Sequence, residues 1–397
     1  MIRSLPPQSR IPFGVLFLNF ALFGATVTVV GATLPIIIRT LNWTYLMAGF
    51  VIAANSFAYF VTTFCAGLAA QRIGLRRMIV AGLLLQALGI GFFGAYPSMA
   101  FNLGAFMLVG IGQGAIEIVT NYSVVQMEPA GQSRLMNLMH SAFTVGAIIA
   151  PFVTGALIGM DVEWRSIFLC LAAASLVLTG VLSSRFVQFQ EPNSEEKIQS
   201  GTGSRLLKQP LLLLLVLIMF LYVGAEIGIS SWISERFVKV YAMTPSDGAN
   251  MVSLFWLGIF LGRLLTSVVY KGDRQGHVLL IFSVSSSVFL AAALMTNRLQ
   301  LSAGLFFFVG IAFSTIYPTV MAIAGHHYES ARGAVIGVVS TGGGIGMCLF
   351  PLIMAGIANF ASIETGFWFY LILTLAMTLI SGIVFRILLR SEDEQHM

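Results

Sequence analysis

Charge is the scarcest property of this sequence. Only 9% of its 397 residues are Asp, Glu, Lys or Arg, and 57% are hydrophobic, whereas about 25% of an ordinary soluble domain is charged. A soluble fold of this length cannot cover its surface with so few charges. The composition therefore excludes a soluble globular protein and predicts a chain embedded in a lipid bilayer.

Cysteine and enzyme motifs are also scarce. Cys65, Cys170 and Cys348 all lie in apolar runs, which excludes a disulfide framework and a zinc site with paired spacing. No H-E-x-x-H or Ser elbow occurs, and the glycine-rich run 342–346 precedes no Lys-Ser/Thr pair. No basic patch with interleaved aromatics is present, so we expect no nucleic-acid partner. We expect no enzyme, metal site or cofactor; the coupling ion is a proton, with sodium as the alternative.

Long apolar runs are abundant. Twelve segments are long enough to cross about 30 Å of hydrocarbon, and they lie at 11–38, 44–70, 77–96, 101–126, 135–159, 166–186, 210–235, 248–270, 277–296, 301–325, 333–359 and 365–389. The first run is too long for the apolar region of a cleaved signal peptide, so we expect it to be retained as a spanning helix.

The two sets of six segments repeat each other at an offset of about 200 residues. Leu103-Gly104-Ala105-Phe106 returns as Ala303-Gly304-Leu305-Phe306, and Pro151 returns as Pro351. A solenoid repeats every few dozen residues, so this long period indicates two duplicated domains. In a membrane chain, that is the architecture of a two-lobed transporter with its site between the lobes.

The predicted fold is therefore an all-α integral membrane protein with two six-helix bundles related by a pseudo-two-fold repeat. We expect the N-terminal bundle at 1–187, a polar cytoplasmic linker at 188–209 and the C-terminal bundle at 210–397.

Lys and Arg predict the orientation, because they are retained in cytoplasmic loops. With both termini inside, fifteen of them face the cytoplasm. The outer side receives five, which are Arg39, Arg165, Arg236, Lys239 and Arg298. We expect a monomer in the cell inner membrane, in contact with the lipid bilayer and a small-molecule substrate.

The loop between the second and third spans carries a motif. It runs Gly67-Leu68-Ala69-Ala70-Gln71-Arg72-Ile73-Gly74-Leu75-Arg76-Arg77 and resembles the G-x-x-x-D-R-x-G-R-R loop signature of the major facilitator superfamily. Here Gln71 replaces the family's Asp and Leu75 one of its basic residues. The resemblance implies a gating role for Gly67, Gln71, Arg72, Gly74, Arg76 and Arg77.

The fifth span is similar to the superfamily's G-x-x-x-G-P-x-x-x-G helix. Gly146, Ala150, Pro151 and Gly155 occupy the motif positions, with Ala150 at one glycine position. The resemblance adds Gly146 and Pro151 to the gating residues.

A narrower resemblance is to the fucose-proton symporter-like branch, which includes hexose permeases. It rests on these segments: Gly110 to Gly114 leading to Glu117 and Asn121; Asn137 with His140; Tyr222 to Glu226 with Trp232; and Tyr317-Pro318-Thr319. The branch's symporters can carry an Asp in the first span, where this chain has no acid. The resemblance implies a sugar as the substrate class.

Only three charged residues lie well inside the predicted spans: Glu117, Glu226 and Arg263. An ionised group at the bilayer centre costs at least ~2.5 kcal/mol, so such residues normally face a cavity or a partner. Function is the default interpretation for all three. Arg263 is expected to act as a gate by pairing with Glu117, or to hold an anionic substrate.

Glu117 and His140 lie at similar depths on neighbouring spans, which makes a proton relay between them plausible; the alternative is a structural hydrogen bond. Asn121 shares a helical face with Glu117, and Asn137 shares one with His140. These amides are suited to the hydroxyls of a polar solute, although Asn also holds membrane helices together.

Glu226 is the acid that the second repeat has where the first has Thr26. With Trp232 nearby, it predicts a sugar site in which the carboxylate binds hydroxyls and the indole stacks on the ring. The alternative is a protonated glutamic acid bonded within its own helix. Further substrate-binding candidates, each equally explained by packing, are Asn55, Trp256 and Tyr317.

The sequence therefore predicts a secondary active transporter that takes up a sugar or similar polar solute with protons. Two alternatives are left open. One is proton-driven efflux of a lipophilic or cationic compound, favoured by 18 Met and 32 Phe. The other is a non-transporting receptor or lipid-handling protein on the same scaffold.

Overall fold

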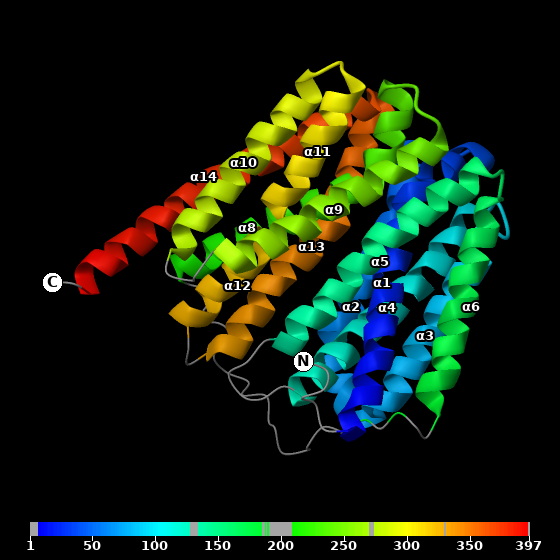
Figure 1. Ribbon diagram of the computed structural model, residues 1–397, viewed down its shortest axis with the longest axis horizontal. Helices are drawn as coiled ribbons and strands as arrows, with labels where there is room; N and C mark the ends of the chain where they lie inside the picture. The colour runs from blue at the N-terminus through cyan, green and yellow to red at the C-terminus, as the bar shows by residue number, and fades with distance from the viewer. Residues whose placement is uncertain are drawn as a thin grey trace. The chain divides into compact units, whose positions relative to one another are not determined.

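The computed structural model describes residues 7–127, 134–184, 187, 189, 209–269, 274–328 and 331–395, without the side chains of 7–8, 66–71, 267–269, 332–334 and 391–395. The secondary structure of these residues is helical (Figure 1). The helices are α1 (Pro7–Thr40), α2 (Tyr45–Ile73), α3 (Leu75–Phe92), α4 (Met99–Met127), α5 (Arg134–Gly159), α6 (Trp164–Ser183), α8 (Pro210–Val240), α9 (Pro245–Val269), α10 (Gln275–Met295), α11 (Leu299–Phe313), α12 (Ile316–His327), α13 (Arg332–Phe360) and α14 (Ile363–Gln395).

Twelve segments of the described chain are long and apolar enough to cross a membrane. The predicted all-α fold with twelve spans is therefore confirmed. The tenth span differs from its prediction, because it consists of two helices, α11 and α12, with a break at Ser314 and Thr315. The predicted linker at 188–209 falls almost wholly outside the described residues.

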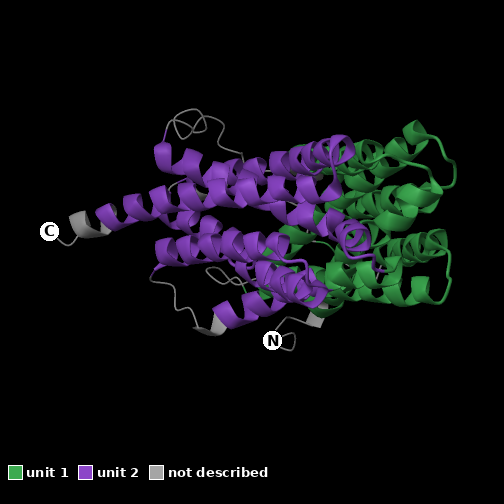
Figure 2. Cartoon of the chain, turned by 90° about the horizontal axis from the view of Figure 1, so that it is seen from above, with its two compact units in different colours: residues 1–197, 244–253 green, residues 198–243, 254–397 purple. Residues whose placement is uncertain are grey.

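The chain divides into two compact units, coloured separately in Figure 2. Unit 1 contains residues 1–197 and 244–253, and unit 2 contains residues 198–243 and 254–397. The start of α9 thus groups with unit 1. There, the Ser246 hydroxyl donates to the Gly155 carbonyl and the Ser253 hydroxyl donates to the Ile148 carbonyl, both at 2.7 Å.

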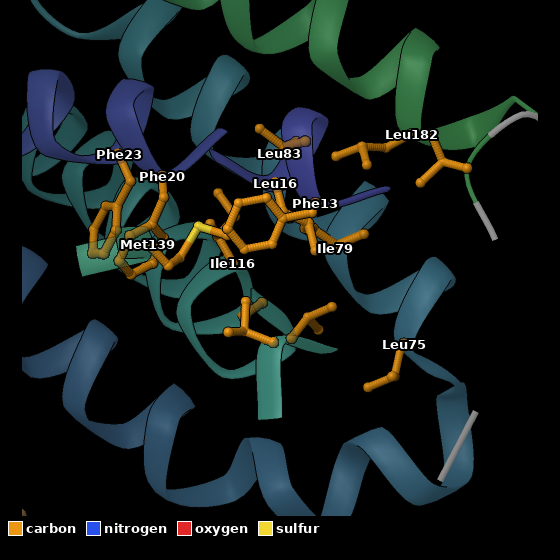
Figure 3. Packing of buried hydrophobic residues seen from close by; sticks show 14 of the residues in the cluster. Phe13, Leu16, Phe20, Phe23, Leu75, Ile79, Leu83, Ile116, Met139 and Leu182 are labelled. Carbon is orange, nitrogen blue, oxygen red and sulfur yellow. The ribbon is translucent and has the colours of Figure 1, made fainter. Parts of the chain in front are cut away.

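Within unit 1, α1 packs on α5, α2 packs on α4, and α3 packs on both α4 and α6. The core between these helices combines a large apolar cluster with buried polar side chains such as Gln86, Thr120 and Ser175. Figure 3 shows Phe20 and Phe23 of α1 beside Met139 of α5, with Ile116 of α4 close by. Because lipid tails are as apolar as these side chains, the helices are held together by van der Waals packing within this core and by hydrogen bonds between helices.

Within unit 2, the equivalent helices pair in the same way. α8 packs on α13 and α14, and α10 packs on α11 and α14. Each of these pairs has its counterpart two hundred residues earlier, as the repeat in the sequence predicts.

Glycines permit the closest helix crossings. A Cβ on Gly146 would meet the Ala21 carbonyl of α1, and a Cβ on Gly346 would meet the Phe220 carbonyl of α8. These two glycines occupy equivalent positions in the two repeats. Without side chains, the helix backbones approach more closely than any other residue would allow.

Candidate functional site

In unit 1, Glu117 lies on α4 facing α2. The Tyr59 hydroxyl donates a hydrogen bond to its carboxylate, and the Asn121 side-chain amide, one turn further along α4, donates to the same group. The helices α2 and α4 approach this closely because Gly114 has no Cβ. A Cβ there would lie 2.9 Å from the Tyr59 carbonyl oxygen. The predicted juxtaposition of Glu117 and Asn121 is therefore present in the structure, whereas Tyr59 is an addition to it.

A second polar group lies one turn earlier on the same two helices. The Asn55 amide donates to the Gln113 side-chain oxygen at 3.2 Å and to the Phe106 carbonyl at 3.3 Å. The Gln113 amide in turn donates to the Thr26 hydroxyl of α1 at 3.1 Å. Asn55, Gln113 and Thr26 thus form a hydrogen-bonded ladder across α2, α4 and α1. The Asn55 amide, which was predicted to contact substrate, donates within this ladder.

His140 lies beside the aromatic rings of α1. Its ring stands edge-on to Phe20 with centroids 5.4 Å apart, Phe20 contacts Phe23 at 5.4 Å, and Phe23 lies 6.4 Å from the Tyr59 ring. The rings of Phe20 and Phe23 therefore lie between His140 and Tyr59, whose hydroxyl donates to Glu117. The proposed relay between these two residues stays a prediction, as does the substrate role of Asn137, whose side chain is exposed.

In unit 2, the buried acid pairs with a phenol of its own helix. The Tyr222 hydroxyl donates to the Glu226 carboxylate at 2.6 Å, one helical turn away on α8. Glu226 is 7% exposed and Tyr222 is fully buried. The positive charge of Arg263 on α9 acts on both groups. Arg263 therefore offsets the charge of Glu226 within the same unit, while its predicted pairing with Glu117 concerns the other unit and stays a prediction.

Arg263 also contacts the break in the tenth span. Its Nε donates to the Ser314 carbonyl at 3.4 Å. In a regular helix this carbonyl would accept from residue 318, but Pro318 has no N–H. The proline explains why the helix breaks here and why a side chain bonds the exposed carbonyl.

The predicted aromatic candidates of unit 2 lie in different surroundings. Trp256 is buried, and its Nε1 donates to the Ser230 hydroxyl of α8 at 2.7 Å. Trp232 is fully buried, whereas Tyr317 is 40% exposed. The groups that act on Glu226 are thus Tyr222 and Arg263. The predicted role of Trp232 beside Glu226 stays a prediction.

The predicted gating motif lies at the start of α3. Gly74 precedes this helix with a φ of 85°, a conformation that favours glycine. Arg72 and Arg77 are exposed, and the Arg76 guanidinium donates to the Val187 carbonyl. The side chains of Gly67 and Gln71 lie outside the described residues. In α5, Pro151 is buried and Gly146 lies at the crossing with α1.

One prediction from the sequence was wrong. The seventh span was expected to end at residue 235 and Arg263 to be the only cation within a span, yet α8 continues to Val240 and Arg236 is fully buried. Its guanidinium lies 5.3 to 5.6 Å from the ring centroids of Phe237, Tyr241, Phe306 and Phe367. The neighbouring Glu235 is only 1% exposed, so it was also missed as a buried acid.

The buried position of Arg236 has a physical explanation. The guanidinium lies over the faces of the surrounding rings, which carry partial negative charge, and such contacts strengthen when water is excluded. The Ser302 hydroxyl accepts from its Nη1 at 3.4 Å, and the charge of Glu364 acts on it. The signal was present in the sequence as aromatic residues at both ends of the second repeat, but only the fold brings them together.

The described chain has twelve segments of membrane length and a carboxylate bonded to a phenol in each unit, so it is a multi-pass membrane protein. The family model described as Major Facilitator Superfamily matches residues 16–296 and 237–396. The chain therefore belongs to the Major Facilitator Superfamily.

The individual relatives are a quarter or less identical to this chain in sequence. A glucose/galactose transporter of Brucella abortus is 25% identical over 329 residues, covering 78% of each chain. A TsgA homolog of Yersinia enterocolitica is 23% identical and covers 84% of each.

Two solved structures share the fold. A D-xylose-proton symporter superposes with a TM-score of 0.76 at 12% identity, covering 93% of this chain and 96% of that one. FucP in its outward conformation has a TM-score of 0.65 at 19% identity, covering 95% and 99%. At these identities the structures support the fold alone.

Proposed function

We propose that this protein is a secondary active transporter of the bacterial inner membrane, with both termini in the cytoplasm. It takes up a sugar or similar small polar solute together with protons, by alternating access between its two bundles. The names of the similar proteins support a sugar as substrate, because they include a glucose/galactose transporter and a D-xylose-proton symporter.

The observation that carries the proposal is a carboxylate in each unit that accepts a hydrogen bond from a tyrosine hydroxyl; Glu226 is buried and Glu117 is half-buried. The pairs are Glu117 with Tyr59 and Glu226 with Tyr222. Ionising a carboxylate in the bilayer interior costs at least ~2.5 kcal/mol, so such a group gains a proton when shielded and releases it when water reaches it. A tyrosine that bonds either form keeps the acid oriented during this cycle.

The energetics suit accumulation of a solute. One proton that crosses a membrane potential of 100 mV supplies ~2.3 kcal/mol. Because each 1.4 kcal/mol is tenfold in an equilibrium constant, this corresponds to roughly fifty-fold accumulation. A single titrating carboxylate is sufficient for that gradient, so the second acid is free to serve substrate binding.

The substrate contacts proposed for unit 1 are Asn121, beside Glu117, and Asn137. In unit 2 they are Trp232, Trp256 and Tyr317. The motif residues of the second loop, with Gly146, Pro151 and Arg263, are proposed to act in gating. Asn55 is better explained as part of the ladder that positions Gln113, because its amide donates to Phe106 and Gln113 within unit 1.

Proteoliposomes test this function directly. Purified protein is reconstituted and a pH gradient is imposed. Uptake of glucose and galactose is measured by their radiolabel, and proton movement is measured with a pH-sensitive dye outside. We expect sugar-stimulated alkalinisation of the medium and accumulation above equilibrium. Replacing sodium with choline distinguishes the two coupling ions, since proton coupling predicts unchanged uptake.

Variants locate the coupling residues. Glu117→Gln and Glu226→Gln keep the shape of the side chain but cannot titrate, so at least one should exchange sugar without accumulating it. Glu163→Gln is the matched control, because Glu163 is an exposed carboxylate that forms an ion pair with the neighbouring Arg165. Dye extrusion that depends on Glu226 would instead support efflux, and unchanged fluxes in both variants would remove these acids from coupling.

A further inference from the structure

The break between α11 and α12 gathers groups that attract negative charge. Arg263 contacts the Ser314 carbonyl at this point. Thr315 immediately precedes α12, and in the first turn of this helix Ile316 and Tyr317 have a backbone N–H whereas Pro318 has none. The N-terminus of a helix carries a partial positive charge and unsatisfied donors, so it stabilises anions. A full cation and a helix N-terminus therefore lie beside each other within unit 2.

Thr315 supplies an independent sign of a ligand. Its side chain is 3% exposed, and its hydroxyl has no hydrogen-bond partner among the described residues. It makes no bond to the first turn of α12, although a threonine in this position ordinarily does so. Other hydroxyls of unit 2, such as those of Thr266 and Thr374, bond to carbonyls of their own helix. A buried hydroxyl without a hydrogen-bond partner destabilises the protein unless a ligand forms the missing bond.

The charged and titratable groups around Glu226 complete the setting. Tyr222 lies on the same helix, the positive charge of Arg263 acts from α9, and Tyr317 belongs to the first turn of α12. From α14, the Tyr370 hydroxyl contacts α8 at Gly228. At the crossing with α13, the neighbours of α8 are Phe350 and Gly346, which carry no charge. Arg263 is thus the cation that opposes Glu226.

We propose that this break is a binding site for the anionic group of the transported solute, and that the solute is a sugar acid. In this site, the Thr315 hydroxyl and the first turn of α12 donate to a carboxylate, and Arg263 supplies the positive charge. The proposal rests on the proposed transport function and specifies its substrate class.

Charge balance links the anion to the proton. While Glu226 is ionised, it offsets Arg263 and an added anion finds no net positive charge. When Glu226 takes up a proton, the charge of Arg263 is left without its counterion, and a carboxylate restores neutrality. The anion and the proton therefore stabilise each other in the site, which is the requirement for symport. A neutral sugar gains nothing from this exchange.

Matched pairs of ligands test the proposal, since each pair differs only in one oxidised carbon. The pairs are glucuronate with glucose, galacturonate with galactose, and gluconate with glucitol. Binding to the purified protein is measured as a shift in thermal unfolding over a range of ligand concentrations. We expect the acid to bind at least tenfold more tightly than its neutral partner in at least one pair.

Isosteric variants separate this site from general effects on the fold. Thr315→Val removes the unpaired hydroxyl and should weaken binding of the acid about tenfold, with no change for the neutral sugar. Thr374→Val is the control, because that buried hydroxyl already bonds to the Leu371 carbonyl. Arg263→Gln should abolish the preference for the acid, whereas Arg263→Lys should retain part of it.

The outcomes distinguish the two proposals. If neutral sugars bind and are accumulated but no acid is preferred, the anion site is wrong and the transport function stands. An acid preference that survives Thr315→Val and Arg263→Gln also overturns the assignment to this break. If no ligand of either kind binds or is transported, both proposals fail.

Discussion

The two units share a backbone plan but differ in the chemistry of their interiors. In unit 1, Asn55, Gln113 and Thr26 form a hydrogen-bonded ladder across α2, α4 and α1. The positions two hundred residues later are Phe255, Phe313 and Glu226. There the rings of Phe255 and Phe313 contact each other at 6.1 Å, and Tyr222 contacts Phe313 at 5.5 Å.

The two acids also differ in position, because they lie on non-equivalent helices of the two units. Unit 1 has Glu117 on α4, where unit 2 has Tyr317; unit 2 has Glu226 on α8, where unit 1 has Thr26. Each acid nevertheless accepts from a tyrosine. Duplication thus preserved the helix packing, while the polar groups diverged until each unit held one acid with its own partner.

The ends of the units show a similar contrast. In unit 1, Phe93, Phe106, Trp164 and Phe168 form an aromatic cluster with centroid distances of 4.3 to 5.9 Å. In unit 2, the equivalent cluster around Phe306 encloses the guanidinium of Arg236. Ile36 occupies the position of Arg236 in the first repeat. The two clusters therefore differ in how deeply the cation is buried, because Arg236 is fully buried, whereas Arg165 lies 4.8 Å from the Trp164 ring and is one-third exposed.

The largest expected effect concerns what the units share. Gly146→Ala and Gly346→Ala each place a Cβ against a helix carbonyl, and both should destabilise the protein by about 3 kcal/mol or more. Gly104→Ala and Gly304→Ala are the controls, because a Cβ there meets no atom within 4 Å. These should be neutral or stabilising by up to about 1 kcal/mol. Thermal unfolding in detergent measures all four, and a large loss in only one repeat would contradict equivalent packing.

Arg236→Lys tests the cation in the aromatic cluster of unit 2. Lysine keeps the charge but loses the planar guanidinium that contacts four rings, so stability should fall by about 2 to 3 kcal/mol. The comparison is Arg165→Lys, since Arg165 lies 4.8 Å from the Trp164 ring but is one-third exposed. We expect that change to cost less than about 1 kcal/mol. Equal losses in the same unfolding assay would mean that burial of Arg236 adds nothing.

The smallest expected difference separates the ladder from the rings that replace it. Gln113→Leu removes bonds to both Asn55 and Thr26 and should cost about 2 kcal/mol, because polar groups stay buried without these partners. Phe313→Leu removes only ring contacts and should cost about 1 kcal/mol. Denaturant unfolding of the two variants measures the difference. If Gln113→Leu were neutral, the ladder would not stabilise unit 1.

Sequence reasoning predicted the helical segments and the repeat well, because both depend on local composition. The failures concern side chains whose environment is set by other helices. Arg236 looked like a loop residue because it lies four residues from the end of α8, yet rings from α11 and α14 enclose it. Tyr59 and Gln113 carried no signal of their own, since an uncharged polar residue in a span is common.

What the sequence by itself determined is the class of protein, the number of spans, the duplication and the positions of Glu117, Glu226 and Arg263. Hydropathy and residue type are sufficient for these, because a bilayer imposes a length on every span and a high free energy on every buried charge. The tertiary structure alone decided the partners: Tyr59 for Glu117, Arg263 for the Ser314 carbonyl, and four rings for Arg236. Partners depend on the rotation and register of helices far apart in the chain, and glycine crossings such as Gly146 with Ala21 set these only after folding.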